Sequence, residues 1–107
     1  MLLINKNGYA EIKCNKSRNV IKPNFSPTKL TAKFNEIIDT ETNKITPVWI
    51  IVCNNVECFD IKESDNNMSV SISTLCDNLT GEIINVTLID QEQNYISDSI
   101  TLEVISV

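Results

Sequence analysis

The chain has 107 residues, of which 42% are hydrophobic and 21% are charged, and its formal net charge is −5. This length allows one domain, and the composition is that of a folded globular protein rather than a disordered chain. An acidic chain without a compact arginine cluster is not expected to bind nucleic acid, and no apolar run is long enough for a membrane-spanning helix.

The charge is distributed unevenly. Residues 1–44 carry seven lysines and one arginine against four acidic residues, a net charge of +4, whereas residues 45–107 have a net charge of −9. One interpretation is an ordinary solvated surface. The alternative is that the two halves fold into opposite poles, which meet on neighbouring copies in a ring or a stack.

Apolar and polar residues alternate in several short segments, which predicts β-strands. Residues 1–8 form a candidate N-terminal arm, and the first strand is expected over residues 9–14. Prolines near Val20-Ile21 are typical of an edge strand that breaks and restarts. A one-faced strand follows over residues 30–34. A helix over residues 29–38 is disfavoured because no suitable cap precedes it. Residues 39–44 predict a polar turn.

Residues 46–53 are the most apolar run and contain the only tryptophan, which predicts a short, deeply buried strand around which the others pack. Alternation sends Trp49 to one face of this strand and its neighbours to the other. One face meets the core, and the second is either covered by the chain or free to contact a partner protein. If the penultimate strand pairs alongside, the candidate interface contains five residues: Val48, Ile50, Val52, Ile83 and Ile89.

Further strands are expected over residues 56–61, 68–73, 84–89 and 100–104. With about seven strands and no helical periodicity, the sequence predicts an all-β protein, an antiparallel β-sandwich. A single tryptophan in the third core strand is typical of an immunoglobulin-like sandwich.

The four cysteines are Cys14, Cys53, Cys58 and Cys76. Cys53 and Cys58 are close enough in sequence to face each other across a hairpin, as a disulfide or as half of a metal site. The C-x4-C spacing is not specific, and there is no histidine. Small, buried, apolar cysteines are therefore the favoured interpretation.

Catalytic and ligand-binding chemistry is not indicated. The chain lacks histidine, which excludes Ser-His and Cys-His arrangements, and Asp60, Glu63 and Asp65 cluster only in a polar turn. We expect neither an enzyme nor a cofactor. The weaker alternatives are a calcium site and a carbohydrate site. Their candidate residues are Asp60, Asp65, Asp77 and Asp90 for calcium, and Tyr9, Phe25, Phe59 and Tyr95 for carbohydrate.

Residues 81–90, with the sequence GEIINVTLID, resemble the penultimate strand of PKD-type and bacterial immunoglobulin-like modules, and residues 97–104 resemble their last strand. The segments Leu30 to Phe34 and Pro47-Val48-Trp49 match their second and third strands, so the resemblance covers residues 28–107. In this chain, residues 90–94 replace the Asp-x-x-Gly turn that usually precedes the last strand. The resemblance implies a single immunoglobulin-like domain.

Such modules occur in tailed-phage virion proteins and in bacterial surface proteins. We therefore expect a non-enzymatic structural subunit of a phage particle, made in the host cytoplasm, in the role of a head–tail connector, a tail component or a capsid decoration protein. Its partners would be other protein subunits, including copies of itself. The alternative is a binding or spacer domain of a bacterial cell-surface or secreted protein.

Overall fold

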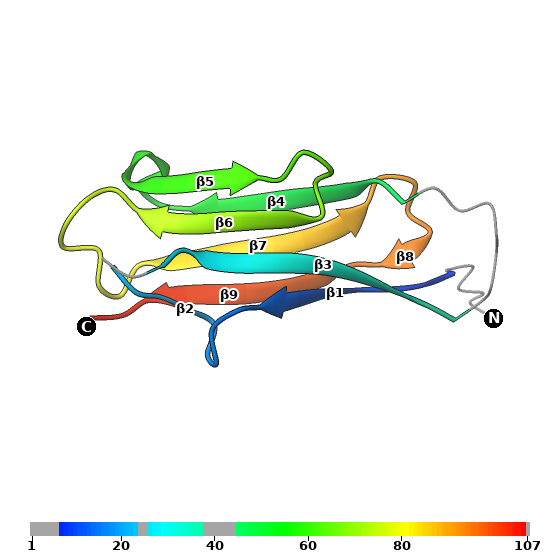
Figure 1. Cartoon of the computed structure of the whole chain (residues 1–107), viewed down its shortest axis with the longest axis horizontal. Coiled ribbons are helices and arrows are strands. Elements are labelled where there is room, and N and C mark those ends of the chain that lie inside the picture. Colours follow the sequence, from blue (N-terminus) through cyan, green and yellow to red (C-terminus); the bar gives the residue numbers. More distant parts are fainter. Residues whose placement is uncertain (1–6, 24–25, 38–44, 107) are drawn as a thin grey trace.

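The computed structural model describes residues 7–23, 26–37 and 45–106. In this part of the chain, nine strands form two β-sheets that pack face to face (Figure 1), and there is one short 3-10 helix. The five-stranded sheet contains, in spatial order, β5 (Phe59–Glu63), β6 (Ser69–Thr74), β3 (Thr28–Glu36), β1 (Gly8–Cys14) and β8 (Tyr95–Ile96). The four-stranded sheet contains β2 (Val20–Ile21), β9 (Asp98–Val104), β7 (Ile83–Asp90) and β4 (Pro47–Cys53). The 3-10 helix η1 (Val56–Cys58) leads into β5.

The predicted all-β sandwich is confirmed, but two of its details are wrong. The described residues contain nine strands rather than about seven, because Val20–Ile21 and Tyr95–Ile96 form separate two-residue strands. The sheets are also mixed rather than antiparallel, since β2 pairs parallel to β9 and β1 pairs parallel to β8. Of the candidate arm, residues 1–6 lie outside the described residues and Gly8 begins β1.

The core lies between the sheets and is built by alternation. Every second residue of β7 points inward, and Ile84, Val86 and Leu88 are fully buried. They pack in one apolar cluster with Trp49 of β4 and with inward residues of the opposite sheet, such as Leu30. Burial of large aliphatic side chains on both inner faces is the main stabilisation of such a sandwich.

The apolar stretch 46–53 is a strand, as predicted, but it is neither central nor buried on both faces. β4 is the terminal strand of its sheet and pairs only with β7. Trp49 is only 8% exposed, whereas Ile50 is 45% and Val52 is 60% exposed. The centre of this sheet is taken by β7 and β9. An all-apolar strand fits an edge as well as a centre, because alternation alone does not say which neighbours it has.

Hydrogen bonds from buried or half-buried groups tie the two sheets together. The Trp49 Nε1–H donates to the carbonyl oxygen of Asn67, in the turn between β5 and β6, at 2.9 Å. On the opposite side of the sandwich, the Ile12 backbone N–H donates to Asp98 Oδ2 at 2.8 Å. The buried Thr28 hydroxyl donates to the Val20 carbonyl at 2.7 Å. Each contact joins one sheet to the other and satisfies a polar group that packing removes from water.

A disulfide joins Cys58, at the end of η1, to Cys76, in the loop after β6, with a Cα–Cα distance of 5.1 Å. The interpretation of these two cysteines as unpaired apolar residues is therefore wrong, and Cys58 does not bond to Cys53. Cys14 and Cys53 are free thiols. The disulfide closes the open end of the β5–β6 hairpin, where Phe59 pairs with Thr74. It fixes β5, which carries the exposed charged residues Lys62 and Glu63, to the end of β6.

Removal of this disulfide has a predictable cost. Its cysteines are 18 residues apart, and a loop of this size corresponds to about 3 kcal/mol of stabilisation through the restricted unfolded chain. Cys58→Ser/Cys76→Ser is expected to lower the free energy of unfolding by about this amount, as measured by urea denaturation. The matched control Cys14→Ser should leave it within about 0.5 kcal/mol. Equal stability of the double variant and the native chain would contradict a disulfide in the folded protein.

Candidate functional site: the apolar outer face of the four-stranded sheet

Register places the predicted interface residues on one surface. Val48 pairs with Ile89, Ile50 with Thr87, and Val52 with Asn85. Directly paired residues of an antiparallel ladder point to the same face of the sheet. This is the outer face, because the alternate residues Trp49 and Leu88 are buried. We call Val48, Ile50, Val52, Ile83 and Ile89 the outer apolar patch.

The outer apolar patch is accessible in the folded chain. Ile50, Val52 and Ile83 are 45%, 60% and 41% exposed, and Val48 and Ile89 are half-buried. Among the described residues, no part of the chain fully covers this face; residues 1–6, which the alternative of a covered face would use, lie outside the described residues. Exposed β-branched side chains gathered on one sheet face mark a protein contact more often than an isolated exposed residue does.

The chemistry of the surface changes from β4 towards β9. In the middle of β7 and on β9 the outward side chains are polar: Thr87 and Ser99 are 2.9 Å apart, and Thr101 donates to Asn85 at 3.0 Å. Glu103 of β9 is also exposed on this face and pairs with Ile83. The continuous apolar part of the face is thus the outward row of β4, with Ile89 beside Val48.

The opposite outer face has another character. On the five-stranded sheet, Lys13 and Glu11 of β1 form an ion pair at 2.9 Å, and Lys62 and Asp60 of β5 lie 3.6 Å apart. The hydrogen bond from Lys13 lowers the pKa of Glu11, with a smaller contribution from Asn35. Solvated ion pairs of this kind contribute little to stability. They make this face hydrophilic, whereas the outward row of β4 on the other sheet is aliphatic.

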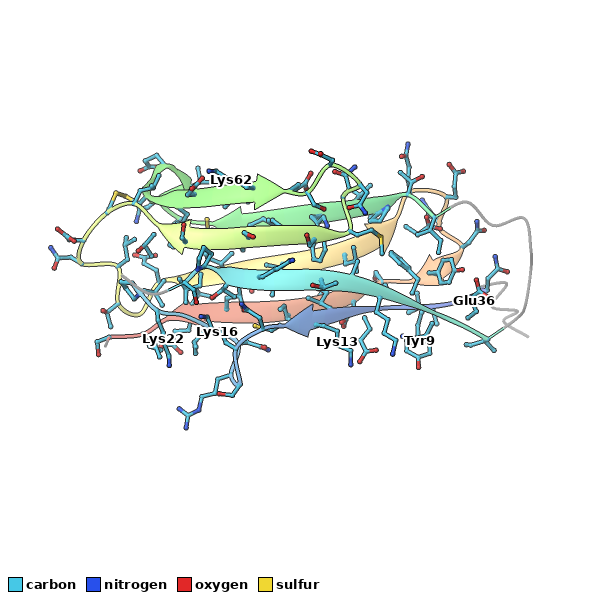
Figure 2. The ribbon with its side chains drawn as sticks, in the orientation of Figure 1. Tyr9, Lys13, Lys16, Lys22, Glu36 and Lys62 are labelled. Carbon is cyan, nitrogen blue, oxygen red and sulfur yellow. A yellow bond between two sulfur atoms is a disulfide. The ribbon has the colours of Figure 1, made fainter. Side chains whose placement is uncertain are left out.

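The basic and acidic halves of the chain do not form separate bodies. β3, from the basic half, lies between β1 and β6, and β2 lies beside β9. The cations nevertheless gather in part: Figure 2 shows Lys13, Lys16 and Lys22 along the margin formed by β1 and β2. A pocket of about 320 Å³ lies there and is lined by Lys16, Arg18 and Lys22 among others. The opposite margin contains β4.

The candidate calcium ligands do not converge. Asp90 is buried, and its two carboxylate oxygens accept hydrogen bonds from the backbone N–H groups of Thr46 at 3.2 Å and Asn94 at 3.0 Å. This carboxylate therefore closes the turn after β7. Asp65 and Asp77 are exposed in other loops. Among the described residues, no three Asp, Glu, Cys or His side chains are grouped to hold a metal ion.

The candidate aromatic residues are also dispersed. Phe59 and Tyr95 are buried, and the Tyr95 ring packs edge-on against Phe34 with 5.2 Å between ring centroids. Tyr9 is exposed on the five-stranded sheet, and Phe25 lies outside the described residues. The three described residues of this set therefore do not form an aromatic platform.

The acidic residues Asp60, Glu63 and Asp65 do not form a group of three that could hold a metal ion. Asp60 instead pairs with Lys62 on an outer face.

The free thiol of Cys53 lies at the end of β4, where sequence analysis had considered a disulfide or metal ligand. Burial raises the pKa of this thiol, and the charges of Glu57 and Glu82 raise it further. A raised pKa disfavours the thiolate, which is the nucleophilic and metal-binding form. Cys53 thus has reduced thiolate character and packs partly against the core.

Comparison with family models, with curated proteins and with solved structures finds no match for this chain. In the described residues, no helix has the length and apolarity to cross a membrane.

The accessibility of the outer apolar patch can be tested by a pair of charged substitutions. Ile50→Asp should cost about 1 kcal/mol or less, because the side chain is half exposed and only strand propensity is lost. Ile84→Asp, on the neighbouring strand but fully buried, should cost more than about 4 kcal/mol because it buries an unpaired charge. Urea denaturation measures both. If Ile50→Asp unfolds the protein as Ile84→Asp does, the patch is core rather than surface.

Proposed function

We propose that this protein is a non-enzymatic structural subunit that assembles with other protein subunits through the outer apolar patch. The observation that carries the proposal is the exposure of Ile50, Val52 and Ile83 on the outer face of the four-stranded sheet. The neighbouring outward side chains of β7 and β9 include hydroxyls, an amide and a carboxylate, so the aliphatic row on β4 differs from the rest of this face. Leaving β-branched side chains on one face is therefore explained best by a contact with another protein.

The strand order supports an immunoglobulin-like sandwich. Without the two-residue strands β2 and β8, seven strands remain. In chain order, the first, second, fourth and fifth (β1, β3, β5, β6) share one sheet, and the third, sixth and seventh (β4, β7, β9) share the other. Immunoglobulin constant-type domains divide their strands in this way, as ABED and CFG. The inward Trp49 on the third strand agrees with the same assignment.

The setting that we propose is a phage particle, in which the chain serves as a connector, tail or decoration component. Support comes from the resemblance of residues 28–107 to modules of virion proteins and from a surface suited to subunit contacts. The Cys58–Cys76 disulfide agrees with a released particle, because virion surfaces are oxidising environments.

A second candidate is a binding or spacer module of a bacterial cell-surface or secreted protein. The same disulfide favours it, because exported proteins form disulfides that the cytoplasm keeps reduced. In this setting the outer apolar patch would contact a neighbouring domain or a secreted partner. The two candidates share the patch and differ in the assembly that contains it.

Co-incorporation of two tagged versions tests the proposal. The native chain and Ile50→Asp are expressed together in the source cells, and particles are purified by density gradient. We expect mass spectrometry to find the native chain at a constant ratio to a capsid protein, and Ile50→Asp to be depleted about tenfold or more. Thr101→Asp, exposed on the same face but on β9, is the matched control and should be incorporated normally.

The other outcomes of this experiment are equally informative. Recovery of the native chain in the envelope or secreted fraction, rather than in particles, would favour the second candidate. Equal incorporation of Ile50→Asp and the native chain would contradict the role of the outer apolar patch. A chain found only as a free protein in every fraction would contradict both candidates.

A further inference from the structure

The free edge of β4 offers a regular row of backbone hydrogen-bonding groups. Thr46 O accepts a bond from Gln91 N at 2.9 Å, and Val104 N donates to Glu82 O at 3.0 Å. Hydrogen-bonded pairs alternate with non-bonded pairs along an antiparallel ladder, so one bond in each ladder fixes the direction of the other backbone groups. By this alternation, the N–H and C=O groups of Val48, Ile50 and Val52 point towards β7. The groups of the alternate residues, Trp49, Ile51 and Cys53, therefore point away from the sheet. In the described part of the chain, these outward groups have no hydrogen-bond partner.

This edge lacks the features that usually prevent edge-to-edge pairing. Natural edge strands are protected by charged side chains, by proline or by a covering loop. β4 begins with Pro47, which removes one N–H at the end of the edge, but from Val48 to Cys53 it contains no charged residue and no further proline. The margins of the five-stranded sheet are protected: β5 carries Asp60, Lys62 and Glu63, and β1 carries Glu11 and Lys13. The β1 edge is also capped where Asp98 accepts the Ile12 N–H.

We propose that β4 pairs antiparallel with β4 of a second copy of this chain, which joins the two four-stranded sheets into one continuous sheet. This inference rests on the proposed function, because it specifies the first contact that the assembling surface makes. An antiparallel pair of identical strands is related by a two-fold axis, the commonest symmetry of protein dimers. Main-chain bonds at such an edge supply affinity, and the side chains beside them supply specificity.

The register follows from the outward groups. A two-fold axis at Ile51 pairs Ile51 with itself and Trp49 with Cys53 of the second copy, so every outward N–H meets an outward C=O. The same register places Ile50 opposite Val52 of the second copy on the outer face. The two outer apolar patches then merge across the axis. Cross-strand pairs of β-branched residues stabilise a sheet by a few tenths to about 1 kcal/mol each.

A second copy is the occupant that the edge favours, because a two-fold axis at Ile51 sets the outward N–H groups of β4 opposite the outward C=O groups of the same strand. Two molecules that each carry a net charge of −5 repel, and the repulsion is least where neither surface is charged. β4 is such a surface. The alternative contact between copies joins the cationic margin of Lys13, Lys16 and Lys22 (Figure 2) to acidic loops of a neighbour. The two contacts differ in their response to salt, because only the second depends on attraction between exposed charges.

The test is sedimentation velocity of the native chain over a range of protein concentrations, at low and high salt. We expect a reversible monomer–dimer equilibrium that high salt leaves unchanged or strengthens, since salt screens the repulsion. Ile50→Lys should weaken the dimer at least about tenfold, and Thr101→Lys should not. Circular dichroism is expected to show that both variants keep the native fold, because both residues are exposed.

A charge-complementation experiment tests the register. In the proposed dimer, Lys at position 50 of one copy lies opposite position 52 of the other. Ile50→Lys and Val52→Glu are expected to dimerise poorly alone and to form a heterodimer when mixed, which native mass spectrometry separates from homodimers. Failure of the mixture to associate better than either variant alone would overturn the proposed register.

Three results would overturn the pairing itself: a monomer at every concentration, a dimer unaffected by Ile50→Lys, or an oligomer that dissociates at high salt. The last would indicate the contact through the cationic margin. None of them removes the proposed function, which fails if Ile50→Asp enters particles as the native chain does, or if the native chain is found only as a free protein. A monomer whose Ile50→Asp variant is excluded from particles would show a patch that binds a different subunit.

Discussion

The pairing of β4 with β7 is the constraint on which the rest of this structure depends. It places Trp49 in the core beside fully buried residues of β7 such as Leu88. The period of two then turns Ile50 and Val52 outward. Because β7 also pairs with β9, β4 is left at the margin with one paired and one unpaired edge. The buried tryptophan, the outer apolar patch and the open edge are therefore three consequences of one ladder.

The sandwich separates its two outer faces by chemistry. The five-stranded sheet presents ion pairs such as Lys13 with Glu11, which interact well with water and weakly with each other. The four-stranded sheet presents hydroxyls and Glu103 on β9 and aliphatic side chains on β4. An assembling protein needs such a difference, because one face must stay soluble while the other makes contact. The Cys58–Cys76 disulfide stabilises the hairpin on the soluble side.

Much of the fold was predictable from local pattern. β1, β3, β6, β7 and β9 follow the alternation of apolar and polar residues, because each has one buried and one exposed face. The outer apolar patch was predicted for the same reason. The two-residue strands β2 and β8 were predicted only in part, because two residues are too few to show an alternation of apolar and polar side chains. Their parallel partners are also distant in sequence. The margin position of β4 and the Cys58–Cys76 bond depend on tertiary neighbours, which neither apolarity nor the C-x4-C spacing specifies.

The most direct measurement is amide hydrogen exchange along β4, followed by NMR at low and high protein concentration. At low concentration, the amides of Ile50 and Val52, bonded to β7, should exchange slowly, and those of Trp49, Ile51 and Cys53 should exchange fast. At high concentration the fast group should become protected as the edge pairs with a second copy. Slow exchange of Ile51 and Cys53 in the dilute monomer would contradict this account, because the edge would then be covered before any partner arrives.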